Sequence, residues 1–200
     1  MRIIEREFYS RDTIDVAKDL LGKILVRVVN GKVLSGTIVE SEAYRSTDDP
    51  ASHSYRGKTE RNSVMFGEVG HAYVYFTYGN HYCLNIVAKD YATPAGAVLI
   101  RAIEPIDGVY LMHKYRKTPD PYNLASGPGK LTQALKITKK HNGIDVTRKG
   151  ELYVVNGKDV SKSEIFATSR IGIRVALDKQ WRFLIADSKF VSKKVKAPNR

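Results

Sequence analysis

Two glutamates and a tyrosine alternate near the end of a segment whose pattern predicts a strand over residues 32–44. Alternate residues of a strand share one face, so Glu40, Glu42 and Tyr44 are expected to point the same way, with Ile38 before them. A carboxyl group that sits in a pocket has a shifted pKa and is suited to proton transfer. The same pattern fits a solvated edge strand with outward polar residues, which is the commoner arrangement. Periodicity does not choose between Glu40 and Glu42.

A group of aromatic residues precedes the dipeptide Gly79-Asn80, which is typical of a tight hairpin turn. Tyr73, Tyr75 and Thr77 share one strand face, and Tyr78 lies beside the turn. An aromatic ring at a hairpin tip can wedge between base pairs, and tyrosines can stack on bases. Tyrosines are also good strand formers that pack across strands. We interpret Tyr73 as part of the fold and Tyr78 as functional.

Polar side chains interrupt two apolar segments. Asn85 lies within residues 83–87, so its amide must be hydrogen bonded or must face a cavity. Arg101 lies within residues 98–103, where a guanidinium needs an anionic partner. That partner is a structural carboxylate such as Glu40, a catalytic glutamate or a nucleotide phosphate.

The charge of the chain favours a polyanionic partner. The 33 lysines and arginines outnumber the 21 acidic residues and give a net charge of +12 over 200 residues. Nucleic acid is the commonest such partner, although an unspecific basic surface or an anionic membrane fits the same balance. Residues 126–130, with Lys130 last, precede a predicted helix and form either a phosphate site or an ordinary capped helix start.

Composition excludes several other classes of protein. The single cysteine, Cys83, cannot form an intramolecular disulfide, and the five histidines form no ligand-spaced cluster. We therefore expect neither a metal nor another cofactor. The sequence contains no apolar run of about 20 residues, and the charged start at 1–6 leads into no apolar segment, so we expect no membrane span and no signal peptide. A soluble, cytoplasmic monomer is the expectation.

The first half of the chain must position these residues through a helix and two hairpins. Ser10 is expected to cap a helix over 11–21. Strands over 23–30 and 32–44 meet at Asn30-Gly31, a strong hairpin signal. Residues 45–70 form a long loop, and such a loop within a compact domain is usually functional. Strands over 71–78 and 81–89 form the second hairpin.

The second half adds helices and short strands. A strand is predicted over 95–103, with helices from 105–107 to about 117 and from 126 to about 137. Further strands are predicted over 151–155, 171–176 and 181–185, and the basic tail, 189–200, is expected to fray. The whole chain, 1–200, is expected to form a single α+β domain with a curved, mainly antiparallel sheet flanked by a few helices.

In this order and spacing, the sequence resembles the alkyladenine (3-methyladenine) DNA glycosylase family over nearly the whole chain. Each matching segment is weak alone, but their joint order is highly specific. Two positions depart from the family pattern: Glu60 stands where proline is expected, and Asn80 stands where a larger apolar residue is expected. The matching segments are 20–23, 38–44, 51–54, 61–62, 65–66, 73–75, 78–79, 83–85, 99–102, 126–128 and 181–183.

The resemblance implies distinct roles for the residues around the two glutamates. Glu42, and not Glu40, corresponds to the catalytic carboxylate of the family. Arg101 would help Glu42 hold the attacking water. Tyr44 and Tyr75 would enclose a base that has been flipped out of the duplex.

The resemblance also implies which residues recognise the lesion and the surrounding DNA. His53 would complete the base pocket, and Asn85 would disfavour the exocyclic amine of normal guanine. Tyr78 would fill the gap that the flipped nucleotide leaves. Segments that border the DNA or the pocket in the family contain Arg61, Asn62, Met65 and Lys130.

The implied activity is that of a monofunctional DNA glycosylase, which removes alkylated or deaminated purines from damaged double-stranded DNA in base excision repair. One competing interpretation is a bifunctional glycosylase-lyase that uses a lysine Schiff base. Another is a noncatalytic nucleic-acid-binding module that uses the same basic surface and tyrosines. The resemblance makes both less favoured than hydrolysis.

Overall fold

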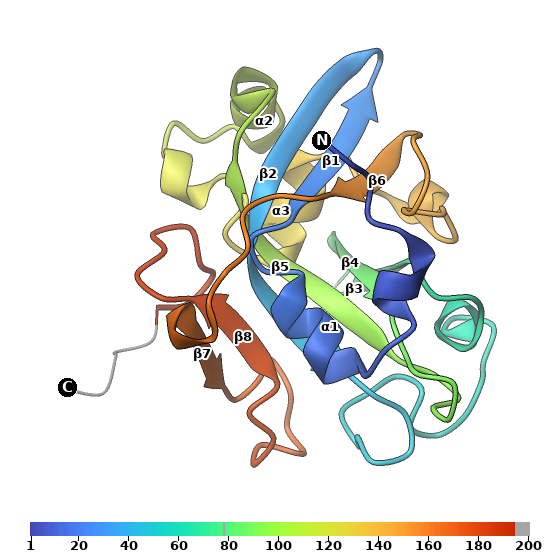
Figure 1. The fold of residues 1–200 in the computed structure, drawn as a ribbon. Coiled ribbons are helices and arrows are strands. Elements are labelled where there is room, and N and C mark those ends of the chain that lie inside the picture. Colours follow the sequence, from blue (N-terminus) through green and yellow to red (C-terminus); the bar gives the residue numbers. More distant parts are fainter. Residues whose placement is uncertain (78, 195–200) are drawn as a thin grey trace.

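An antiparallel sheet organises the chain around one long strand, β2 (Lys32–Tyr44). The computed structural model describes residues 1–77 and 79–194. Within them the strand order is β3-β4-β5-β2-β1-β6, while β8 pairs with β2 and β7 pairs with β8 (Figure 1). The other strands are β1 (Ile24–Val29), β3 (Ala72–Thr77), β4 (His81–Val87), β5 (Ala97–Pro105), β6 (Leu152–Val155), β7 (Ile165–Thr168) and β8 (Arg182–Ile185). The expected α+β class with a curved antiparallel sheet is confirmed.

The hairpin between β1 and β2 forms as predicted. Asn30 and Gly31 have φ angles of 49° and 74°, which a type I′ turn requires at both central positions. Val29 pairs with Lys32, so the loop has two residues. The local turn sequence therefore fixes the register of the first two strands.

Helix α1 (Thr13–Asp19) packs on β2 and β5, in front of the sheet in Figure 1. Asp12, and not Ser10 as expected, caps it, because the Asp12 carboxylate accepts hydrogen bonds from the amides of Ile14 and Asp15. Ser41 ties the helix to β2, since its hydroxyl donates to the carbonyl of Ala17 at 2.7 Å.

The other two α-helices are shorter than the sequence suggests. Helix α2 (Val109–Arg116) begins after Gly108, whose φ of 69° interrupts the helical path from Pro105. Helix α3 (Pro128–Ala134) has proline in its first turn and packs on β4 and β5. Short 3-10 helices complete the described chain: Arg6–Tyr9, Ser63–Phe66, Pro121–Asn123, Lys139–His141 and Lys162–Glu164.

In the second hairpin, β3 pairs with β4 from Ala72 opposite Ile86 to Thr77 opposite His81. The predicted wedge, Tyr78, lies outside the described residues. The register sets Tyr73 opposite Asn85 and Tyr75 opposite Cys83, so these four side chains share one face.

Paired register shifts interrupt the regular alternation of β2. Between Ile38 and Glu40, and again between Glu40 and Ser41, the pairing with β5 slips. Val39 is thereby the extra residue on β2, and Arg101 is the extra residue on β5. Ile38 consequently joins the main core, and so does Ala43, which strict alternation would put on the other face. The prediction that Ile38 shares a face with Glu42 is wrong for this reason.

The C-terminal part of the structure differs from the sequence-based prediction in two respects. Residues 171–176 form no strand, because Gly172 and Ala176 have φ angles of 82° and 54°, which break an extended path. Strand β7 lies just before them and was missed. Contrary to the prediction, the tail is held at Val191 and Ser192, because Val191 is buried and the backbone amide of Ser192 donates to Glu40 at 2.5 Å. Residues 195–200 lie outside the described chain.

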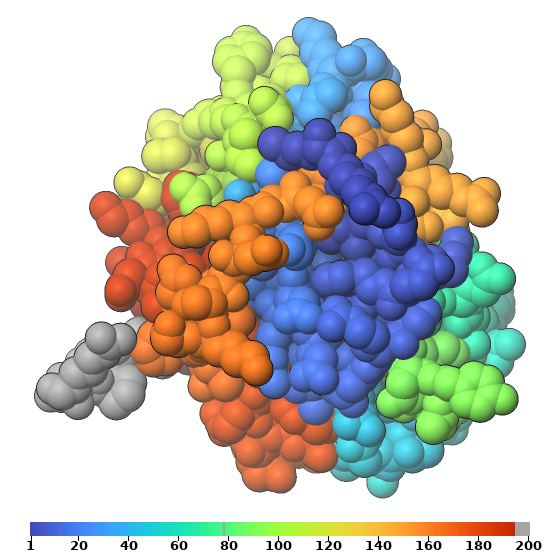
Figure 2. All heavy atoms as spheres, in the orientation of Figure 1, coloured from blue at the N-terminus to red at the C-terminus, as the bar shows by residue number. Residues whose placement is uncertain are grey.

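The N-terminal segment closes one side of the molecule. Figure 2 shows it, in dark blue, lying against the orange segment that contains β6. Ile4 donates a backbone hydrogen bond to Val154, and Asn156 donates one to Arg2. The N-terminal segment thus braces β6, at one end of the strand order of the sheet.

Candidate active site

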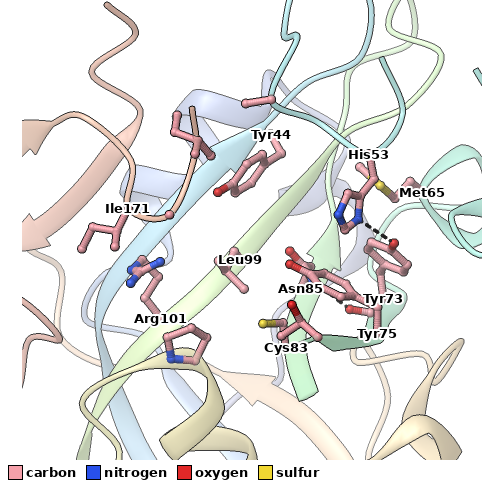
Figure 3. Close-up of a pocket in the computed structure, with 15 residues that line it drawn as sticks. Tyr44, His53, Met65, Tyr73, Tyr75, Cys83, Asn85, Leu99, Arg101 and Ile171 are labelled. Atoms are coloured by element: carbon pink, nitrogen blue, oxygen red, sulfur yellow. Dashed lines mark hydrogen bonds between the residues drawn. The ribbon is translucent and has the colours of Figure 1, made fainter. Parts of the chain in front are cut away.

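A cavity of about 280 Å³ lies between the β3–β4 hairpin, the end of β2 and the loop that follows β7 (Figure 3). This volume is near the lower limit of ligand pockets, about 300–1,000 Å³, and suits a ligand of one or two aromatic rings. Predicted site residues from four separate segments come together in its wall: Tyr44, His53, Met65, Tyr75, Asn85 and Arg101.

Glu42 lies directly behind this wall and has no solvent exposure. Its Oε1 atom accepts a hydrogen bond from the backbone amide of Ile171 at 2.8 Å, and its Oε2 atom accepts one from the Tyr44 hydroxyl at 2.8 Å. Both donors belong to residues of the pocket wall. The carboxylate is therefore separated from the cavity by a single layer of side chains and backbone.

The pKa of Glu42 reflects two opposing influences. Burial raises the pKa above its ordinary value, and the Glu40 carboxylate adds to this effect. Arg101, the Ile171 amide and the Tyr44 hydroxyl oppose it, because each stabilises the ionised carboxylate. Burial prevails, so Glu42 takes up protons more readily than an exposed glutamate does.

Arg101 lies between the two glutamates. Its Nε atom donates to Oε1 of Glu40 at 2.8 Å, and its Nη1 atom lies 3.2 Å from Oε1 of Glu42. The bulge at Arg101 in β5 faces the bulged part of β2, which allows one guanidinium to contact both carboxylates. Arg101 thus contacts both glutamates, so two of the partners expected for its guanidinium are present at once.

Glu40 differs from Glu42 although both are fully buried. Burial alone would raise the pKa of Glu40, but Arg101, Arg182 and the Ser192 amide together hold it below its ordinary value. Arg182 donates to Glu40 at 2.7 Å from its Nε atom, and the Ser192 hydroxyl donates at 2.7 Å. Glu40 is thus an ionised structural anchor, and Glu42 has fewer cationic partners.

Aromatic rings form facing walls of the cavity. Figure 3 shows Tyr44 on one side and Tyr73, Tyr75 and His53 on the other. The rings of Tyr73 and Tyr75 lie 5.3 Å apart, and His53 meets Tyr75 edge to face at 4.6 Å. Burial raises the pKa of Tyr44 and of Tyr75 far above the ordinary value, so both remain neutral phenols. A flat ring fits between such walls.

His53 comes from the long loop after β2 and is fixed by Tyr73. Its Nδ1 atom lies 3.0 Å from the Tyr73 hydroxyl. Burial, and then the charge of Arg61, lower the pKa of His53, so the imidazole is neutral at neutral pH. A neutral imidazole can donate or accept a hydrogen bond at the pocket. Tyr73, which the sequence assigned only to the fold, has the additional role of orienting His53.

Asn85 and Asn62 are both buried, but their side-chain amides donate hydrogen bonds to different parts of the chain. The Nδ2 atom of Asn85 donates to the carbonyl of Tyr73 at 3.1 Å, beside the cavity. Asn62 instead donates to the carbonyls of His53 and Gly57 at 2.8 and 3.0 Å. The contacts of Asn62 therefore tie together the loop that carries His53.

The remaining predicted residues lie around the pocket. Arg61 is exposed, lies with its guanidinium 5.4 Å from the Tyr75 ring and donates to the Phe76 carbonyl at 3.3 Å. Lys130 is half-buried in the first turn of α3, two residues after Pro128 of the pocket wall.

Several pocket residues were missed in the sequence. Ile171, Gly172 and Ile173 line the cavity as irregular backbone, although their apolar pattern resembles a strand. Cys83 faces the cavity because it lies opposite Tyr75, and this placement follows from the hairpin alternation. No local signal identifies Ile171, since its amide contacts a residue 129 positions earlier.

Within residues 1–77 and 79–194, no group of three or more His, Cys, Asp or Glu residues is placed to hold a metal ion. In the same residues, no helix combines the length and apolar character that a membrane span requires.

Comparison with known proteins gives consistent matches over the chain. Residues 7–189 match the sequence model of a family described as methylpurine-DNA glycosylase. A protein of Carboxydothermus hydrogenoformans is 51% identical over 96% of this chain and 100% of its own length. Proteins of Clostridium novyi and Methanocella arvoryzae are 49% and 48% identical, each over 97% of this chain and 100% and 98% of their own lengths. All three relatives carry the provisional name 3-methyladenine DNA glycosylase.

Proposed function

Because this chain belongs to the methylpurine-DNA glycosylase family, we propose that it flips alkylated or deaminated purines out of duplex DNA and hydrolyses their N-glycosidic bond. Family membership makes it a DNA glycosylase of DNA repair, a hydrolase of N-glycosyl bonds.

One observation carries the proposal: a buried carboxylate lies behind an aromatic pocket and contacts a guanidinium. Glu42 is held by Tyr44, Ile171 and Arg101, and all three line the cavity. A ring placed between Tyr44 and Tyr75 brings its sugar toward this group. Without the carboxylate, the same pocket would serve binding alone.

The proposed chemistry begins with base flipping. A base within a duplex is inaccessible, and extruding it costs a few kcal/mol, least for a damaged or mispaired base. The N-glycosidic bond then breaks toward an oxocarbenium-like sugar, as in glycoside hydrolysis. Ionised Glu42 stabilises this cation and accepts a proton from the attacking water, with Arg101 positioning both.

The leaving base determines how much further help is needed. Alkylated purines such as 3-methyladenine already carry a positive charge and leave readily. Neutral bases such as hypoxanthine require a proton before they leave. Neutral His53 contacts the base, and Asn85 disfavours the exocyclic amine of normal guanine.

The surface around the pocket mouth would hold the duplex. The net charge of +12 favours phosphate contacts, and Arg61 and Lys130 lie beside the cavity. Tyr78, which directly precedes Gly79-Asn80 in the sequence, would fill the gap in the base stack. Met65 contributes to the pocket wall, and Asn62 positions the loop that carries His53.

Water is the proposed nucleophile. Tyrosine, histidine, threonine, cysteine, asparagine, arginine and apolar side chains line the described part of the pocket, and no lysine is among them. A lysine Schiff base would need such a residue within reach of the sugar. We therefore propose hydrolysis without a lyase step.

The test is to incubate the protein with duplexes that each contain one lesion and to measure the free base released. Hypoxanthine and ethenoadenine can be placed in synthetic duplexes, and 3-methyladenine can be released from methylated DNA. Release of free base that leaves an intact abasic strand supports the proposal. Binding without release would identify a noncatalytic module, and borohydride trapping of a covalent complex would identify a lyase.

A further inference from the structure

A buried ion pair lies behind the pocket and takes no direct part in lining it. The side chains of Arg170 and Asp49 have no solvent exposure. Nη1 and Nη2 of Arg170 donate to the two carboxylate oxygens of Asp49, each at 2.6 Å, and Nη1 also donates to the Ala43 carbonyl at 3.0 Å. This is a two-pronged pairing that a planar guanidinium makes well.

The pair contacts the site first through Tyr44. The guanidinium carbon of Arg170 lies 4.6 Å from the centre of the Tyr44 ring and 5.2 Å from that of Trp181. At this distance the cation attracts the face of the ring. Because the Tyr44 hydroxyl donates to Glu42, the orientation of this ring sets one of the hydrogen bonds of the carboxylate.

A second link passes through the backbone. Arg170 is followed directly by Ile171, whose amide donates to Glu42 at 2.8 Å. The loop there is irregular, and Gly172 has a φ of 82°, so no sheet pairing holds the amide in place. The residue before this amide, Arg170, is instead anchored through its guanidinium to Asp49 and Ala43.

A third link runs through Asp49 to the long loop. The Asp49 carboxylate also accepts hydrogen bonds from the backbone amides of Arg45 and Ala51, at 3.1 and 3.3 Å. Ala51 and His53 of that loop line the cavity. One ion pair thus joins the strand that carries Glu42, the loop that carries His53 and the loop that carries Ile171.

Buried ion pairs add little net stability, because desolvation of the charges offsets their attraction. Their arrangement is therefore better explained by the geometry that they impose. We propose that Arg170 and Asp49 are positioning residues for base excision, which hold the Tyr44 ring and the Ile171 amide on Glu42 in the orientation that the reaction requires. This inference rests on the proposed hydrolytic function.

The test uses three variants of the full chain. Arg170→Met removes the charge and the pairing, Arg170→Lys keeps the charge but loses the planar fork, and Asp49→Asn keeps the shape of the partner. Arg27→Met is the matched control, since Arg27 is buried and bonds to backbone carbonyls far from the pocket. Asp49→Asn retains a hydrogen-bond acceptor and guards against failure of the arginine variants to fold.

The measurement is single-turnover release of 3-methyladenine from methylated duplex DNA across a pH series. Displacement of a reacting group by about 1 Å costs up to about 100-fold in rate, and we expect losses of about 10–100-fold for the three variants. In a plot of the excision rate against pH, protonation of Glu42 lowers the rate on the acidic side. Loss of the Ile171 or Tyr44 hydrogen bond should move this acidic limb upward by about one pH unit. The other charged or titratable groups that interact with Glu42 are Arg101, Glu40, Tyr44, Tyr75 and Cys83, which the variants leave in place. Arg170 itself also interacts with the charge of Glu42, so Arg170→Lys and Asp49→Asn, which keep the positive charge of residue 170, separate positioning from simple loss of charge.

Two controls separate positioning from a structural effect. Affinity for undamaged duplex should not change, because the pair does not reach the surface. Arg27→Met should leave both the rate and the acidic limb unchanged. If the variants excise at the wild-type rate, or lose rate without the shift in the acidic limb, the inference is overturned. If the wild-type protein releases no base, the proposed function fails instead.

Discussion

The Nη1 atom of Arg101 lies 3.2 Å from Oε1 of Glu42, with both side chains buried beneath the pocket wall. Even so, burial keeps the pKa of Glu42 above its ordinary value. Arg101 is shared with Glu40, which receives its Nε hydrogen bond at 2.8 Å. The two glutamates consequently have opposite effects on the stability of the fold.

Glu42→Gln should stabilise the protein at neutral pH. A group with a raised pKa contributes stability below its unfolded-state pKa and loses that contribution as the pH rises through its folded-state pKa. At neutral pH, where the unfolded-state carboxyl is ionised, the raised folded-state pKa of Glu42 therefore costs stability that glutamine does not. We expect a gain of about 0.5–2 kcal/mol, the usual size of a stabilising substitution, because active sites often trade stability for function.

Thermal unfolding at neutral and at acidic pH checks this prediction. The advantage of Glu42→Gln should be largest at neutral pH and should shrink as the pH falls and the wild-type carboxyl becomes protonated. A variant that is less stable than the wild type at neutral pH would contradict it.

Glu40→Gln should have the opposite effect. Because Glu40 has a lowered pKa, it contributes stability above its unfolded-state pKa, and this contribution disappears as the pH falls through the folded-state value. The substitution leaves Arg182 without its buried carboxylate, which typically costs about 3–5 kcal/mol.

Denaturant unfolding at neutral pH measures this loss, with Glu42→Gln as the matched control for the same chemical change. The difference in the free energy of unfolding between Glu40→Gln and the wild type should become smaller at acidic pH. Equal stability of Glu40→Gln and the wild type at neutral pH would show that the anchor is dispensable.

The sequence predicts those parts of the fold that local chemistry determines. Asn30-Gly31 specifies its turn, and the alternation of Tyr73, Tyr75 and Thr77 correctly places these residues on one face. The bulges at Val39 and Arg101 depend on pairing between distant strands, so strict alternation placed Ile38 wrongly. The pattern of residues 171–176 predicted a strand, but the positive φ angles of Gly172 and Ala176 break the extended path, and the chain forms a loop whose first three residues line the pocket.

Some residues of the site could be predicted from the sequence, and others could not. Residues that interrupt an apolar pattern, such as Asn85 and Arg101, could be recognised as candidates because burial of a polar group demands a partner. The choice of Glu42 over Glu40 came from the family resemblance. The contacts of Arg170 and Ile171 were not predictable, because they join segments more than 100 residues apart.

Tyr44→Phe isolates the hydrogen bond from the ring. The substitution keeps the aromatic face but removes the hydroxyl that donates to Glu42 at 2.8 Å. The pKa of Glu42 should rise further, and the acidic limb of excision should move upward by about one pH unit. The pH dependence of 3-methyladenine release measures this effect, because a cationic base needs no additional proton.

Tyr75→Phe is the control for this experiment. It also removes a pocket hydroxyl, but that hydroxyl is not one of the groups that hydrogen bond to Glu42 in the described residues, which are the Tyr44 hydroxyl and the Ile171 amide. The acidic limb of its pH–rate profile should coincide with that of the wild type. Superimposable profiles for Tyr44→Phe and the wild type would argue against the proposed role of the hydroxyl.

Tyr78→Ala should weaken base flipping more than the chemical step. An inserted side chain compensates for lost stacking, and stacking on an aromatic residue is worth about 1–3 kcal/mol per base. Fluorescence of 2-aminopurine placed beside the lesion reports the disturbed stack. An unchanged fluorescence signal in the variant would exclude Tyr78 as the wedge.

The most direct test of the account is excision by Glu42→Gln under single-turnover conditions on methylated duplex DNA. Loss of a positioned acid or base typically costs about 10²–10⁴ in rate, and we expect a fall of that size with nearly unchanged affinity for the damaged duplex. Affinity measured on the same preparation establishes that the variant is folded and that its pocket is intact. Excision at close to the wild-type rate would contradict the assignment of Glu42.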